Sequence, residues 1–141
     1  MHLDDQQVIL SSEIMPRRAP ASAPAPEPAA VVSRALLRAA DALGLNGQTM
    51  ARGVGVSAAS WSRLAAGQRA VNPTSKEGEL ALLFLRLFRS LDALVGGDSE
   101  KARAWLRAQN QHLSAVPLEC IQSVAGLVRV DEYLDAVRGK T

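Results

Sequence analysis

Histidine and cysteine, which supply most metal ligands and many nucleophiles, are almost absent from this chain. One of its 141 residues is cysteine and two are histidine. Cys120 alone excludes an internal disulfide and any Cys-x-x-Cys metal pair, and a lone thiol fits the reducing cytoplasm. Because His2 and His112 lie far apart in the chain, a zinc site or a Ser-His-Asp triad is not expected. We therefore predict a cytoplasmic protein that is not an enzyme and holds no metal or cofactor.

Aromatic residues are also scarce, at 4% of the chain, so the core must consist mostly of Ala, Leu and Val, which favours packed helices. The 48% hydrophobic content is too high for a disordered chain, and the length fits one domain or two very small ones. No membrane span is expected, because charges at Arg86, Arg89 and Asp92 interrupt the longest apolar stretch. The apolar run Val8–Leu10 is too short for a signal peptide.

Proline is concentrated in one place. Five of the seven prolines lie between residues 16 and 28, where they remove backbone donors and favour an extended chain. We expect residues 1–30 to form a flexible Pro/Ala-rich extension. The rest is predicted all-α, without strands, with helices over residues 33–43, 47–54, 57–66, 79–95, 99–108, 117–124 and 128–138. Gly126 is expected to end the sixth of these helices and Gly139 the last.

The stretch 79–95 is apolar on nearly all sides, with Leu83, Leu87 and Leu91 on one face and Phe88 among the residues of the other. Such a helix is either the centre of a core or one half of a dimer interface, and the sequence leaves both open.

Positive charge is unevenly distributed along the chain. Residues 31–90 carry eight Lys/Arg against three acids, a net charge of +5, whereas residues 1–30 sum to −2 and residues 91–141 to −1. A basic middle beside a mildly acidic end indicates two different partners, one of them a polyanion. A solvated surface without a partner gives the same pattern.

Residues 48–64 meet the requirements of a helix-turn-helix. Ala51 supplies the small residue that two closely crossing helices need, and Gly55 allows positive φ in the turn four residues later. Ser57 follows as an N-cap of the second helix. The apolar packing positions are filled by Met50, Val54, Val56, Trp61 and Leu64. This spacing resembles the Xre-type (Cro/repressor-like) helix-turn-helix, whereas an ordinary helical hairpin is the plainer interpretation.

The resemblance implies that the second helix enters the major groove of double-stranded operator DNA. Its outward residues are Ser57, Ala58, Ala59, Ser62 and Arg63. Of these, only Arg63 can hold a guanine edge bidentately. Phosphate contacts are expected from Gln48, Thr49, Arg52 and Arg69, although each arginine also fits a solvated surface charge. Because one copy offers few base contacts, we expect a homodimer on two half-sites.

The C-terminal part resembles the toxin-binding domain of Xre/MbcA/ParS-type antitoxins. The residues that carry the resemblance are Trp105-Leu106, Asn110, Pro117-Leu118-Glu119, Gly126, Val130, Leu134 and Gly139. Together with the helix-turn-helix, the resemblance covers residues 34–141. The chain departs from the family pattern before the proline, where Leu113-Ser114-Ala115-Val116 replaces a common Gly-Gly pair.

The resemblance implies a type II antitoxin that represses its own promoter and neutralises a cognate toxin by covering its active site. In this family the toxin is often a RES-domain protein that degrades NAD. The implied domains are the extension 1–30, a helix-turn-helix domain 31–77, a central apolar dimerisation helix 78–97 and a toxin-binding domain 98–141. The candidate toxin contacts are His112, Ser114, Pro117, Tyr133, Arg138, Gly139, Lys140 and Thr141.

Three alternatives stand beside this interpretation. The domain's own core and caps account better than toxin contacts for Trp105, Leu106, Pro117, Leu118 and Gly126, and Tyr133 fits either role equally. The acidic residues Asp131, Glu132 and Asp135 form either a face for a basic toxin surface or a solvated helix face. A stand-alone helix-turn-helix repressor, whose C-terminal half only dimerises, is the alternative function.

Overall fold

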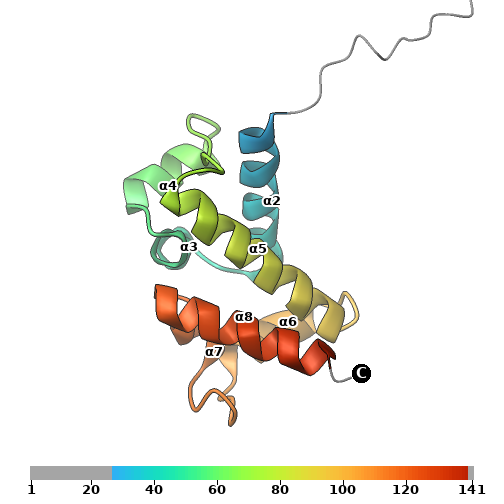
Figure 1. Ribbon diagram of the computed structural model, residues 1–141. Helices are drawn as coiled ribbons and strands as arrows, with labels where there is room; N and C mark the ends of the chain where they lie inside the picture. Colours follow the sequence, from blue (N-terminus) through green and yellow to red (C-terminus); the bar gives the residue numbers. More distant parts are fainter. Residues whose placement is uncertain (1–26, 140–141) are drawn as a thin grey trace, which may run out of the picture.

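The computed structural model describes residues 27–139, and over this range the chain forms seven α-helices and no strand (Figure 1). In chain order they are α2 (Pro28–Leu43), α3 (Gly47–Val54), α4 (Ala58–Ala65), α5 (Lys76–Leu94), α6 (Ser99–Arg107), α7 (Pro117–Cys120) and α8 (Val124–Gly139). The predicted all-α class is therefore confirmed. None of the helices in this range is long and apolar enough to cross a membrane.

The first described helix begins earlier than its periodicity predicted. We expected a start at Ser33, but α2 begins at Pro28, inside the predicted Pro/Ala-rich extension. Proline is well tolerated at this first position, because the backbone N–H that it lacks would have had no partner within the helix. Gly44 ends α2 as expected, with a φ of 65°. Residues 1–26 of the predicted extension lie outside the described residues.

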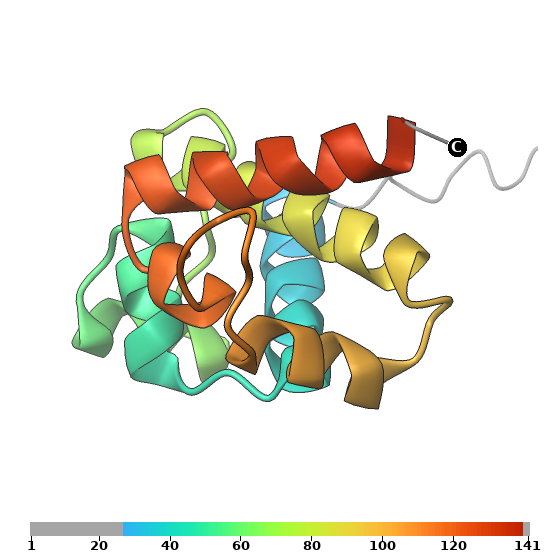
Figure 2. The ribbon, with the colours of Figure 1, turned by 90° about the horizontal axis from the view of Figure 1, so that it is seen from below.

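Helix α5 forms the centre of the core. It packs against α2, α3, α6 and α8, and it lies beside α8 in both views (Figure 1, Figure 2). Phe84, Leu87 and Leu91 are fully buried, whereas Leu82 remains 46% exposed. The sequence left two roles open for this helix, the centre of a core or half of a dimer interface. In the described part of the chain, α5 is a core helix. Its first turn is capped by Ser75, whose Oγ accepts a hydrogen bond from the Gly78 N–H at 3.1 Å.

Two arginines of α6 tie the C-terminal helices to the end of α2. Arg103 Nε donates to the Ala42 carbonyl at 2.8 Å, and Arg107 donates to the carbonyls of Leu43 at 3.3 Å and Gly44 at 2.9 Å. The last carbonyls of a helix have no partner within it and carry partial negative charge, so cationic donors stabilise this end. These bonds fix α6 against α2.

The predicted C-terminal end of the helix over residues 117–124 was wrong. Helix α7 stops at Cys120, and Gly126 lies in the first turn of α8 instead of closing the helix before it. A Cβ on Gly126 would lie 1.9 Å from the Cys120 carbonyl oxygen, so the close approach of α7 to α8 requires glycine at this position. The last helix therefore begins at Val124, four residues earlier than expected, and ends at Gly139.

Candidate DNA-binding and partner-binding surfaces

Helices α3 and α4 cross where the sequence pattern placed the crossing. Ala51 is buried, and Gly55 adopts a φ of 74° in the turn that follows α3. Ser57 caps α4 by accepting a hydrogen bond from the Ser60 N–H at 3.0 Å. Trp61 is only 7% exposed and belongs to the hydrophobic core. This arrangement is that of a helix-turn-helix.

A second glycine permits the close packing of this pair, and sequence reasoning missed it. A Cβ on Gly47 would lie 2.9 Å from Cδ1 of Trp61, because the indole ring packs over the first turn of α3. Asn46 caps that turn through its side-chain oxygen, which accepts from the Thr49 N–H at 2.9 Å. A glycine followed by helix formers, directly after an asparagine cap, was the signal available in the sequence.

The outward face of α4 is available for contact. All five residues expected to face DNA are exposed, namely Ser57, Ala58, Ala59, Ser62 and Arg63. The Arg63 side chain donates to Ser60 Oγ at 3.2 Å, one turn away on its own helix, and does not enter the interior. Gln48 on α3 is also exposed, and Thr49 is half-buried.

The two remaining candidate phosphate contacts have partners within the chain. Arg69 NH2 lies 2.7 Å from Glu77 Oε1, and its NH1 atom is buried without a partner among the described residues. The carboxylate compensates this charge, so Arg69 stabilises the segment between α4 and α5. Arg52 on α3 is exposed and donates to the amide oxygen of Gln122 at 3.2 Å.

The loop between α6 and α7 is held in a defined shape. The backbones of Asn110 and Ala115 bond to each other at 2.9 and 3.3 Å as an isolated antiparallel bridge. Arg129 of α8 donates to the Leu113 carbonyl at 2.6 Å, from outside the loop. Ser114 at the tip is exposed and has a φ of 53°, a conformation that glycine adopts more readily than serine. The loop is therefore ordered although the common Gly-Gly pair is missing.

Three rings from separate elements form a row beside this loop, which we call the ring row: Trp105, Tyr133 and His112. The centroids of Trp105 and Tyr133 are 6.3 Å apart, with an interplanar angle of 13°. The His112 ring also stacks with that of Tyr133, with centroids 5.4 Å apart and an interplanar angle of 28°. His112 is exposed, whereas Trp105 and Tyr133 are half-buried against the core. The row is thus a fixed aromatic surface with one accessible end.

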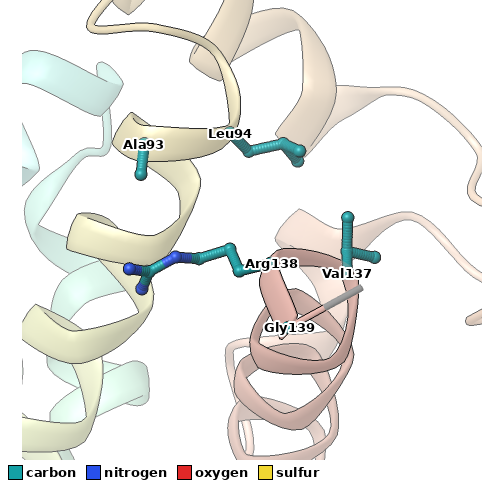
Figure 3. A pocket seen from close by; sticks show the side chains of 5 residues that line it. All are labelled: Ala93, Leu94, Val137, Arg138 and Gly139. Carbon is teal, nitrogen blue, oxygen red and sulfur yellow. The ribbon is translucent and has the colours of Figure 1, made fainter. Parts of the chain in front are cut away.

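The other predicted toxin contacts lie in different environments. Pro117 is buried as the first residue of α7, so its side chain is not part of the exposed surface. Arg138 and Gly139 lie at the end of α8, beside a hollow of about 550 Å³ that Ala93 and Leu94 of α5 also line. Figure 3 shows the Arg138 side chain extending from α8 towards α5, where its NH1 donates to Ser90 Oγ at 3.0 Å. Lys140 and Thr141 lie outside the described residues.

Two of the three residues of the predicted acidic face of α8 pair with Arg86 of α5. Asp131 is buried and lies 3.5 Å from Arg86 Nε, and Asp135 also pairs with Arg86. Burial raises the pKa of Asp131 above its ordinary value of 3.8, and the neighbouring Asp135 adds to the increase while Arg86 opposes it. Of the three acids, Glu132 alone is exposed, and Asp135 is half-buried. Both sequence-based interpretations were therefore wrong for Asp131, because neither foresaw its contact with Arg86 of α5, whereas the exposure of Glu132 agrees with a solvated helix face.

Comparison with known protein families gives two adjacent matches. Residues 22–86 match the model of the antitoxin Xre-like helix-turn-helix domain. Residues 90–140 match the model of the antitoxin Xre/MbcA/ParS C-terminal toxin-binding domain. A search of curated proteins found no relative that matches the chain. The boundary between the two matches falls within α5, the helix that both parts share as their core.

Proposed function

Because the chain belongs to the Xre/MbcA/ParS antitoxin family, as a type II antitoxin with a helix-turn-helix domain and a toxin-binding domain, we propose two specific activities for it. It neutralises a RES-type, NAD-degrading toxin by covering that toxin's active site, and it represses its own promoter. It performs no catalysis, acts in the cytoplasm and binds the operator as a homodimer. The RES assignment rests on the family's common partner.

The exposed face of α4 supports operator binding. Ala58, Ala59 and Ser62 are small, so backbone and side chains can approach the base edges closely, and the alanine methyl groups suit contact with thymine. Arg63 supplies the one bidentate donor on this face, an interaction worth roughly 1–3 kcal/mol of discrimination for guanine. Affinity from a single copy is then low, and a homodimer on two half-sites supplies the rest.

The single observation that carries the toxin-binding proposal is the ring row beside the ordered 109–116 loop. Aromatic side chains bury a large area at a low cost in conformational entropy, and they are enriched at the positions that contribute most to protein interfaces. His112, Ser114 and Tyr133 therefore form the centre of the proposed toxin surface, to which Arg138 and Gly139 at the end of α8 are added as further proposed contacts. Such a surface inhibits by excluding substrate, which requires no reactive group in the antitoxin.

Co-expression with the protein of the neighbouring reading frame tests the proposal. Alone, that protein is expected to stop growth and to lower cellular NAD, and the antitoxin is expected to restore both. Tyr133→Ala is the matched variant that should restore both less well than the wild type. A neighbouring protein with no effect on growth, together with intact operator binding by this chain, would instead support a stand-alone repressor.

A further inference from the structure

The two halves of the chain meet at a further contact, besides the end of α2 and the packing of α5 against α6 and α8. Helix α7 lies beside α3, as seen from below in Figure 2. The contact is close, because a Cβ on Gly53 of α3 would lie 3.1 Å from the Ile121 carbonyl oxygen directly after α7. Ile121 itself is buried in the shared core. The DNA-facing half therefore rests directly on the toxin-binding half.

One side chain at this contact is bound at both ends. The amide nitrogen of Gln122 donates to the Leu118 carbonyl at 3.0 Å, and its amide oxygen accepts from Arg52 NH1 at 3.2 Å. Since the nitrogen is fixed by α7, the oxygen must point towards α3. Gln122 is half-buried, whereas Arg52 is exposed, so the glutamine is the more fixed partner of the two.

The chemistry of this partner distinguishes Arg52 from Arg69. A guanidinium has five N–H donors, and the hydrogen bond to Gln122 uses one of them. Within residues 27–139, Arg52 has no carboxylate partner, so its positive charge is not compensated there. Arg69, in contrast, is paired with Glu77. A neutral oxygen holds an arginine in place without lowering its attraction for a phosphate.

We propose that Gln122 is a positioning residue for DNA binding: it holds Arg52 on α3 in place for a backbone phosphate. The toxin-binding domain thereby contributes to operator affinity through one hydrogen bond across the contact of α7 with α3. This inference rests on the proposed function, because it requires that α3 and α4 face DNA. The effect is entropic, since a long side chain that is already ordered loses less freedom when it binds.

Binding of a labelled duplex by the full chain, measured by fluorescence anisotropy over a range of salt concentrations, tests the inference. The probes are the promoter duplex of the chain's own gene and a mixed-sequence duplex of the same length. Arg52→Ala should weaken binding to both probes and reduce the slope of log affinity against log salt by about one. Gln122→Ala should weaken binding by roughly two- to tenfold, the ordering cost of one long side chain, with the slope unchanged.

Two further variants separate positioning from a general structural role. In Arg52→Ala, the additional Gln122→Ala change should have no effect on binding, because the side chain that it positions is already gone. Gln122→Glu should reduce the salt slope as Arg52→Ala does, because a carboxylate compensates the guanidinium charge. Gln109→Ala removes an exposed glutamine of the same domain and should bind like wild type. Thermal unfolding monitors the fold of each variant.

The outcomes separate this inference from the function on which it rests. Additive losses in the double variant, a wild-type salt slope in Gln122→Glu, or wild-type binding by Arg52→Ala would each overturn the role of Gln122 while leaving DNA binding intact. A wild-type chain that binds neither duplex refutes the proposed operator binding and this inference with it.

Discussion

Gly126 offers the sharpest test of how the toxin-binding half is packed. A Cβ at this position would lie 1.9 Å from the Cys120 carbonyl oxygen and 2.7 Å from its carbonyl carbon. Carbon and oxygen atoms ordinarily approach to about 3.3 Å, so Gly126→Ala forces α7 and α8 apart by more than about 1 Å. Because the obstacle is backbone, no side-chain rotation relieves it.

The expected magnitude follows from two opposing effects. Overpacking costs about 1–3 kcal/mol, and the obstruction by backbone places this case at the upper end of that range. Replacing glycine with alanine in a helix gains about 1 kcal/mol. The net loss in the free energy of unfolding is about 2 kcal/mol, which lowers the melting temperature by on the order of 10 °C for a chain of this size.

Thermal unfolding followed by circular dichroism measures the effect, and the same helix contains its own control. Gly139, at the other end of α8, has no atom within 4 Å of an added Cβ, so Gly139→Ala should melt at or slightly above the wild-type temperature. If Gly126→Ala melted as high as the wild type, the close approach of α7 to α8 would be refuted.

Three further predictions concern charge, backbone and the ring row. The pKa of Asp131 is raised in the folded state, so the stability of the wild type should fall relative to that of Asp131→Asn as the pH rises above 3.8. If the melting temperatures of the two proteins differed by the same amount at every pH, this prediction would be contradicted. At the positive φ of Ser114, Ser114→Gly should be tolerated whereas Ser114→Val should lower stability by about 1–2 kcal/mol in urea unfolding, and equal stability of the two variants would refute backbone strain in this loop. Tyr133→Ala removes the middle of the ring row and should weaken toxin binding by about 2 kcal/mol in calorimetry without changing duplex binding, whereas wild-type toxin affinity would remove the row from the interface.

The local features of the fold followed from short stretches of sequence. Gly55 and Ser57 act within one turn of their own position, so the residue type alone indicated the positive φ and the helix cap. Asp98 acts equally locally in the structure, where its carboxylate caps α6 by accepting from the Glu100 and Lys101 N–H groups at 3.0 and 3.2 Å. Such signals need no knowledge of what packs against the helix.

Several of the features that the sequence did not indicate depend on contacts between separate elements. Arg103 looks like a surface charge until α6 is placed against the end of α2, and Asp131 looks exposed until α5 brings Arg86 to it. In the sequence, Gly126 suggests the end of a helix. Its actual role depends on the Cys120 carbonyl, which lies close to Gly126 only because of the way the chain turns after α7. Periodicity identifies which residues are buried on a helix but not which element covers them.

The ring row shows the same limit within the candidate site. His112 and Tyr133 were singled out separately from the sequence. The structure stacks all three, which no spacing along the chain could indicate, because they come from α6, a loop and α8.

The central claim, that two separate surfaces bind two different partners, is tested most directly by Arg63→Ala in parallel assays of operator binding and toxin neutralisation. Operator affinity should fall by at least about fivefold, from the loss of one guanine contact of about 1–3 kcal/mol, while neutralisation in the growth assay stays at the wild-type level. Arg38→Ala, which removes an exposed arginine of α2, is the control for net charge and should leave both activities in place. Loss of both activities in a folded Arg63→Ala variant, or operator binding at the wild-type level, would contradict the claim.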